Sequence, residues 1–167
     1  RIWAPYFDRN FRHFHVEQTP YSAPTDYVAA AARGNITYVA TPIFRSYSRF
    51  GYAVYRQLIA NCLRRFVPDP LVRAGVPSTA QVTLTEQPDR RIVHVLSYSP
   101  ERRTPELDIV EDVIPLAQVK LAARLDPRPR QVYLAPQRQT LDFEYRDGYA
   151  HVTVPSVHGH QMVVFET

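Results

Sequence analysis

The sequence has few of the residues on which several kinds of functional site depend. Cysteine occurs once among the 167 residues, at Cys62, so the chain can form neither an internal disulfide nor a thiolate metal cluster. We interpret Cys62 as a small buried hydrophobic residue of a helix. The five glycines do not cluster as a phosphate-binding loop requires, and no serine has the spacing of a nucleophile elbow. We therefore expect no cofactor and no resident metal.

Long apolar runs and a surplus of one charge are also missing. No run approaches the roughly 18 apolar residues of a membrane span, and the N-terminus lacks the layout of a secretory leader. The sequence has 20 Lys and Arg and 16 Asp and Glu, and positive and negative residues are interleaved, as in Glu101-Arg102-Arg103. This pattern predicts a mixed solvated surface. We expect a soluble, cytoplasmic protein with neither membrane nor nucleic acid as a partner.

The pattern of apolar residues changes at Pro68-Asp69-Pro70. Residues 46–66 repeat apolar side chains at helical spacing, which predicts one long helix with Ser46 or Ser48 as its N-cap. Before it, residues 36–40 are β-branched and aromatic, which is typical of a short buried strand. Residues 27–33 are rich in alanine and end at Gly34-Asn35, a turn or helix C-cap signal. The order strand, link and helix predicts the end of an α/β unit.

The chain after residue 70 alternates with the period of β-strands. Asp147-Gly148 stands between two alternating segments and predicts a tight hairpin turn with positive φ. Strands at this spacing, with prolines between them, predict an antiparallel β-sandwich. We therefore predict a mainly β chain with an α/β remnant at residues 1–69 and a β-sandwich at residues 70–167. The expected strands are 81–86, 91–98, 107–113, 118–125, 131–135, 141–146, 149–154 and 160–166.

Three groups of residues are candidates for chemistry. The pairs His13/His15 and His158/His160 have the spacing of metal ligands on a strand, but neither has a third ligand, which favours a structural role. The acidic cluster around residues 106–112 offers paired carboxylates, although an exposed charged edge strand explains it better. Eleven tyrosines suggest sugar stacking, yet most fall at strand positions where core packing explains them equally well.

Several segments resemble the C-terminal region of multidomain bacterial glycoside hydrolases. They are PLVR at 70–73, PSTAQVTL at 77–84, RIVHVLSYSPERR at 91–103, DIVEDVIPL at 108–116 and GHQMVVFE at 159–166. They look most like the α-L-fucosidases of glycoside hydrolase family 151, with family 42 β-galactosidases as architectural relatives. Upstream, FRHF at 11–14, QTP at 18–20 and YVATPIF at 38–44 resemble the end of the trimerisation domain of these enzymes, a flavodoxin-like or amidotransferase-like α/β unit.

The resemblance implies an enzyme whose catalytic (β/α)₈ barrel precedes this chain. Residue 1 is Arg and the only methionine is Met162, so we expect a fragment or a processed product of a longer protein. No catalytic residue can then be assigned within this chain, which we expect to be inactive alone. Its partners would be the missing N-terminal barrel and further copies in a homo-oligomer, with carbohydrate bound by the parent enzyme.

One segment is a candidate substrate-binding site. Residues 12–18 place His13, His15 and Glu17 among aromatic side chains, a combination suited to sugar hydroxyls. In an oligomer this segment could complete the pocket of a neighbouring subunit, although a purely structural role explains it better. Two other functions stay open: a carbohydrate-binding module, which needs two or three coplanar exposed aromatic rings, and a free-standing adaptor domain.

Overall fold

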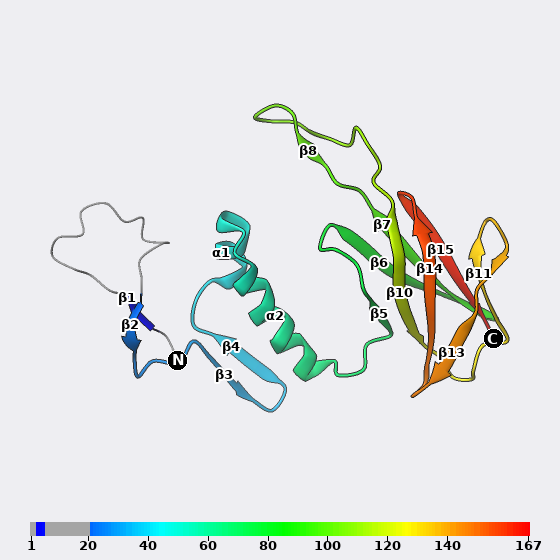
Figure 1. The fold of residues 1–167 in the computed structure, drawn as a ribbon. Helices are drawn as coiled ribbons and strands as arrows, with labels where there is room; N and C mark the ends of the chain where they lie inside the picture. The colour runs from blue at the N-terminus through cyan, green and yellow to red at the C-terminus, as the bar shows by residue number, and fades with distance from the viewer. Residues whose placement is uncertain (1–2, 6–20) are drawn as a thin grey trace. The chain divides into compact units, whose positions relative to one another are not determined.

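The computed structural model describes residues 3–5 and 21–167. The chain divides into two compact units, residues 1–68 and residues 69–167, which we call the first and the second unit. Strands dominate, and the two helices both belong to the first unit among the residues described (Figure 1). Neither of these helices is long and apolar enough to cross a membrane.

The second unit is an antiparallel β-sandwich, as predicted. One sheet has the strand order β13-β14-β10-β5 and the other β12-β11-β15-β7-β6 (Figure 1). Every pairing within them is antiparallel. The strands are β5 Val72–Ala74, β6 Ala80–Gln87, β7 Arg90–Ser97, β10 Leu116–Arg124, β11 Gln131–Ala135, β12 Gln139–Thr140, β13 Phe143–Arg146, β14 Tyr149–Val157 and β15 His160–Glu166.

The two sheets enclose one apolar core. Alternate residues of each strand point inward, since side chains on a strand have a period of two. Phe165 is fully buried and belongs to one cluster with Val93, Val95, Val119, Leu121, Val132, Val152, Val154 and Val163 among others. The few polar groups inside are paired: the side-chain amide of Gln161, for example, donates to the carbonyl oxygen of Ala135 at 3.0 Å.

The tight turn predicted at Asp147-Gly148 is confirmed. Asp147 has φ 51° and Gly148 has φ 75°, and the flanking residues Arg146 and Tyr149 are directly paired. Positive φ at both central residues matches the right-handed twist of the strands, which is why Asp-Gly is favoured here. This turn fixes the register in which β13 and β14 pair.

The first unit differs from its prediction in two respects. The helix expected over residues 46–66 is two helices, α1 Ile43–Phe50 and α2 Ala53–Phe66. Gly51 adopts a left-handed φ of 66° and its N–H donates to the carbonyl oxygen of Tyr47, which ends α1. The N-caps are Pro42 and Tyr52, so the N-cap expected at Ser46 or Ser48 is wrong.

The alanine-rich segment and the strand after it form a hairpin. β3 Ala30–Arg33 pairs antiparallel with β4 Ile36–Val39, and Gly34-Asn35 is the turn between them. Ile36 is 72% exposed and Tyr38 is 66% exposed, so the buried strand expected at residues 36–40 is wrong about burial. A second small pair, β1 Trp3–Pro5 with β2 Tyr21–Pro24, precedes it.

Residues 98–115 connect β7 with β10 and form what we call the arm. It carries its own two-stranded sheet, β8 Glu101–Arg102 with β9 Asp108–Ile109, outside both sheets of the sandwich (Figure 1). The strand expected over residues 107–113 is therefore wrong beyond two residues. Prolines at 100, 105 and 115 lack the N–H that a longer ladder requires.

Candidate functional site

The sequence places its candidate substrate-binding site at His13, His15 and Glu17. These three residues lie outside the described residues, so their role stays a prediction. The structure describes four other surfaces on which a function could rest: the helical face of the first unit, the outer faces of the two sheets, and the arm.

The helical face of the first unit is apolar and uncovered. None of the fourteen residues of α2 is buried. Phe44 of α1 is 73% exposed, and Val54 and Leu63 of α2 are 67% and 57% exposed. An amphipathic helix owes most of its stability to packing of its apolar stripe. A helix with this many exposed apolar side chains is typical of a surface that another polypeptide covers.

A small cavity lies beneath this face. Its volume is about 160 Å³, and its lining is almost entirely apolar: Thr37, Val39, Ile43, Phe44, Leu58, Ile59, Cys62, Leu63 and Phe66. The hydroxyl oxygen of Thr37 is buried and has no hydrogen-bond partner among the described residues. Cys62 is half-buried in this lining, less than the full burial we expected. A buried polar atom without a partner is costly, so this site is incomplete by itself.

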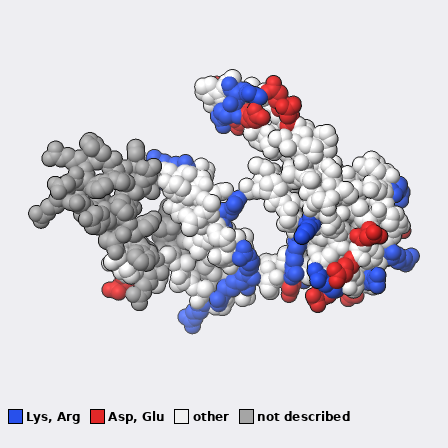
Figure 2. Space-filling model, in the orientation of Figure 1, with Lys and Arg blue, Asp and Glu red and all other residues white. Residues whose placement is uncertain are grey.

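The charge of the helical face has one sign. α1 contributes Arg45 and Arg49, and α2 contributes Arg56, Arg64 and Arg65, while neither helix has an acidic residue. Figure 2 shows the contrast with the arm, where blue and red side chains are mixed. Arginine around an apolar surface is a frequent composition of protein interfaces, since the guanidinium binds carboxylates through two parallel hydrogen bonds.

The outer face of the sheet β13-β14-β10-β5 has a polar hollow of about 720 Å³. Cross-strand pairing sets His151 opposite Glu144 on one side and opposite Ala122 on the other. The small Ala122 leaves room between longer side chains. The polar groups that line the hollow are Lys120, Thr140, Asp142, Glu144, Arg146, His151 and Thr153.

No aromatic platform accompanies this hollow. Tyr149, on the same face, is 2% exposed because the guanidinium of Arg73 lies 4.1 Å from its ring centre. On the other sheet, Tyr133 is 3% exposed under Arg138. Tyr98 is the one aromatic side chain in residues 69–167 that is more than 36% exposed. Sugar stacking requires open ring faces, so burial explains these tyrosines better.

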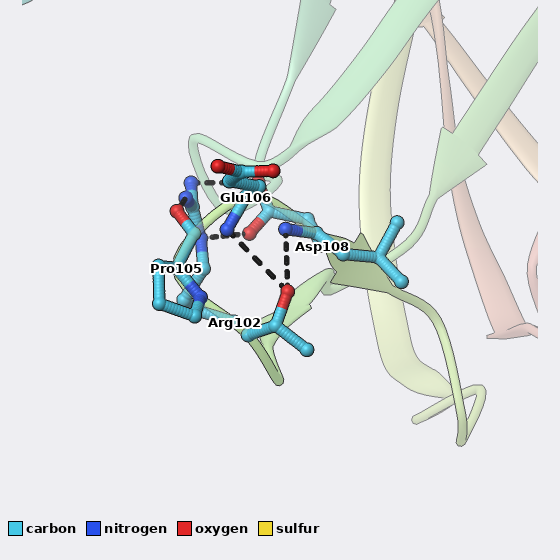
Figure 3. A network of polar contacts seen from close by, with 6 residues as sticks. Arg102, Pro105, Glu106 and Asp108 are labelled. Atoms are coloured by element: carbon cyan, nitrogen blue, oxygen red, sulfur yellow. Dashed lines mark hydrogen bonds and ion pairs between the residues drawn. The ribbon is translucent and has the colours of Figure 1, made fainter.

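Arginines pair with Asp108 and Glu111 of the acidic cluster on the arm. Figure 3 shows Arg102 directed at both the carbonyl oxygen of Pro105, at 2.8 Å, and the carboxylate of Asp108, at 3.1 Å. Arg103 pairs with Glu101 at 2.8 Å and with Glu111. General acid and base catalysis needs a carboxylate free to exchange a proton on a rigid scaffold. Asp108 and Glu111 instead are exposed and paired with arginines, which agrees with the charged, non-catalytic interpretation of this cluster.

Of the two histidine pairs noted in the sequence, His158/His160 belongs to no metal cluster among the described residues, and His13/His15 lies outside them. Within residues 3–5 and 21–167, no three His, Cys, Asp or Glu side chains are placed to hold a metal together. His160 hydrogen-bonds with His94, a residue that sequence spacing did not associate with it. The pairing joins two strands that are distant in sequence, so only the sheet register reveals it.

One of the comparisons with known proteins finds a glycoside hydrolase similar to this chain. No family model matches the chain, and no curated protein matches it. Among solved structures, α-L-fucosidase isoenzyme 2 from Paenibacillus thiaminolyticus matches 98% of this chain with 31% identity and a TM-score of 0.85. A cycloisomaltooligosaccharide glucanotransferase from Paenibacillus sp. matches 57% of the chain with 17% identity and a TM-score of 0.41, and carries no argument.

The fucosidase match covers nearly all of this chain but only 26% of the fucosidase. The chain thus spans about a quarter of that enzyme. The similarity supports a glycoside hydrolase-related domain. Membership of family 151 stays a prediction.

Proposed function

We propose that this chain is a non-catalytic, C-terminal portion of a glycoside hydrolase that serves assembly and stability of the enzyme. The helical face of the first unit would dock on the remainder of the parent enzyme or on another subunit of its oligomer. The parent would be an α-L-fucosidase or a related glycosidase, with its catalytic carboxylates in an N-terminal barrel. The likeness to the Paenibacillus fucosidase over 98% of the chain supports this proposal.

The observation that carries the assembly role is the absence of burial along α2. Each exposed valine, leucine or phenylalanine that becomes buried stabilises an assembly by about 1.5 to 3 kcal/mol. Phe44, Val54 and Leu63 supply three such side chains.

The experiment replaces apolar side chains of the helical face by serine in the parent enzyme. Phe44→Ser and Leu63→Ser should weaken the assembly, measured as the oligomer mass in sedimentation at decreasing concentration. Leu107→Ser is the matched control, because Leu107 is 54% exposed but lies on the arm. Equal oligomer mass in all three variants, with activity unchanged, would contradict the proposal.

The predicted inactivity of the chain alone has its own test. Retaining glycosidases hold two carboxylates ~5 to 5.5 Å apart on a rigid scaffold, and we expect the N-terminal barrel of the parent enzyme to supply that pair. We expect no hydrolysis of nitrophenyl fucoside or galactoside by residues 1–167. Turnover that survives repurification would show catalytic groups within this chain.

The candidate residues His13, His15 and Glu17 belong to the same proposal, as a segment that completes the substrate pocket of a neighbouring subunit. Replacing His13 and His15 separately by Ala in the parent enzyme should lower kcat/KM by ~10²-fold, which is ~2.7 kcal/mol of transition-state stabilisation, with the oligomer intact. If activity falls only as the oligomer dissociates, the segment is structural.

A carbohydrate-binding module is the second candidate, and the hollow at Glu144, Arg146 and His151 favours it by its supply of polar groups. The buried Tyr149 opposes it, because a sugar finds no open ring there. Calorimetry with an oligosaccharide distinguishes the two: measurable binding that Glu144→Ala removes would favour the module.

A further inference from the structure

His94 and His160 meet on the outer face of the sheet β12-β11-β15-β7-β6, and no function proposed above involves them. In β7, Val93 and Val95 point into the core, so His94 between them points outward. In β15, the core position of Val163 likewise puts His160 on the outer face. The register pairs His160 with Leu96, two residues from His94. The two imidazoles are therefore diagonal neighbours across adjacent strands, within reach of each other.

The rings face each other through one nitrogen each. Nδ1 of His94 lies 3.2 Å from Nε2 of His160. The ring centres are 5.4 Å apart and the planes lie within 10° of parallel. A centre separation this much larger than the nitrogen separation places the contact at the ring edges. One of these nitrogens donates its proton to the other. If the donating ring changes tautomer and carries its proton on its other nitrogen, both facing nitrogens present lone pairs on neutral rings.

The surroundings orient His94 and contain no carboxylate. The hydroxyl of Thr85 lies 3.4 Å from Nε2 of His94, at the far side of the ring from His160. The shallow pocket around the pair has a volume of about 330 Å³ and is lined by Gln81, Thr83, Thr85, His94, Leu96 and His160. Imidazole nitrogen is thus the strongest metal-binding group of this lining. Mg²⁺ and Ca²⁺, which require oxygen ligands and favour carboxylates, do not suit it.

We propose that His94 and His160 form a two-histidine site for a late first-row transition-metal ion, Zn²⁺ or Cu²⁺, with water in the other positions. Two nitrogens bound to a tetrahedral Zn²⁺ at 2.0–2.1 Å lie about 3.3 Å apart, close to the spacing observed here. The imidazoles need only turn in place until their lone pairs converge. Thr85, bonded to the opposite nitrogen of His94, fixes the ring as hydrogen-bonded partners of metal ligands do.

The site has two consequences. Cu²⁺ binds more tightly than Zn²⁺, following the general order of nitrogen sites. The metal also ties β15, the last strand, to β7, and therefore stabilises the second unit in proportion to its occupancy. Both imidazoles must be neutral to bind, so protons compete with the metal for the ring nitrogens.

The test is a titration of tag-free residues 1–167 with Cu²⁺, followed by NMR. Cu²⁺ is paramagnetic and broadens the signals of the imidazoles that it contacts. We expect substoichiometric Cu²⁺ to broaden His94 and His160 together, before His151 and His158. Zn²⁺ should compete with Cu²⁺ at this site, and Mg²⁺ should not. Broadening that spares His94 and His160, or that spreads equally over all resolved histidines, overturns the proposal.

Variants give an independent measurement. His94→Ala and His160→Ala should each weaken Zn²⁺ binding in calorimetry at least ~10-fold. His151→Ala, on the outer face of the other sheet, is the matched control and should bind like the parent chain. All four proteins are compared with His13 and His15 also replaced by Ala, so that this pair cannot contribute. Both side chains are at the surface, and circular dichroism checks that each variant is folded. Unchanged Zn²⁺ affinity in both folded variants overturns the proposal.

Discussion

The two units of this chain differ in how many apolar side chains each buries by itself. The second unit surrounds Phe165 with a core of fully buried side chains contributed by both sheets. In the first unit, Ile43 is the one buried side chain among residues 23–68. Both units have regular strands, helices or turns, so local structure is not what separates them. The second unit has the core that an independent domain needs, whereas the first has elements without one.

The contrast suggests where each unit draws its stability. Hydrophobic burial is the dominant favourable term in folding, and exposed helices of this length are marginal in water. The helices and the hairpin of the first unit follow local rules, such as the left-handed Gly51 that ends α1. Their exposed apolar side chains are those of an interface, which is the basis of the proposed assembly role.

The largest expected effect comes from truncating a buried side chain in the core of the second unit. Phe165→Ala removes a fully buried ring and should lower the free energy of unfolding by about 3 to 5 kcal/mol. Leu63→Ala, on the uncovered helix α2, should change it by less than ~0.5 kcal/mol in the isolated chain, because Leu63 is 57% exposed.

Urea unfolding monitored by amide hydrogen exchange measures the change in free energy of unfolding of both variants. Amides of β7 and β15 should report the loss in Phe165→Ala, while amides of α2 exchange quickly in every variant. A Leu63→Ala loss as large as that of Phe165→Ala would mean that the first unit has a core of its own.

A smaller effect is expected at the hairpin turns, where the two units can be compared with the same chemistry. Gly148 and Gly34 have φ of 75° and 55°, and an added Cβ would meet no atom within 4 Å at either. Gly148→Ala should therefore cost about 1 kcal/mol of global stability through backbone strain alone. Gly34→Ala has the same strain but should change only local exchange in β3 and β4.

Gly75→Ala is the control for this pair. Gly75 lacks a positive φ, and its added Cβ would stand in ordinary contact with Lys120. It should leave stability within ~0.5 kcal/mol of the parent chain. If Gly34→Ala destabilises the second unit as much as Gly148→Ala, the two units unfold together.

Local signals in the sequence predicted the sandwich well. Residues 131–135 and 160–166 form strands with the predicted bounds, because their alternation and flanking turns are local. The turn at Asp147-Gly148 was predictable because these two residues alone favour the positive φ angles that it requires. The hairpin at residues 30–39 was missed because alanine favours helices, and the pairing with β4 overrides that preference.

The candidate sites were harder to predict. His94 and His160 are 66 residues apart, and only the register of β7 against β15 joins them. The burial of Tyr149 depends on Arg73 of β5, the edge strand of its sheet. Non-local contacts of this kind leave no periodic trace in the sequence. The sequence predicted the apolar stripe of the helical segment, but not that the stripe is exposed.

The smallest expected effect is on the arm, and it tests whether the arm belongs to the stable part of the second unit. Arg103 pairs with Glu101 and Glu111, and its side chain is 48% exposed. Exposed ion pairs are screened by water and salt, so Arg103→Ala should cost at most ~0.5 kcal/mol of global stability. The variant should nevertheless open the arm locally, because two carboxylates lose their shared partner.

Limited proteolysis between residues 100 and 112 measures this local opening. Arg146→Ala is the control on the sandwich itself, where Arg146 lies 3.8 Å from Glu144. We expect faster cleavage of the arm in Arg103→Ala at an unchanged urea midpoint. A lowered midpoint would mean that the arm folds as one body with the sandwich, whereas unchanged cleavage would mean that its shape does not depend on these ion pairs.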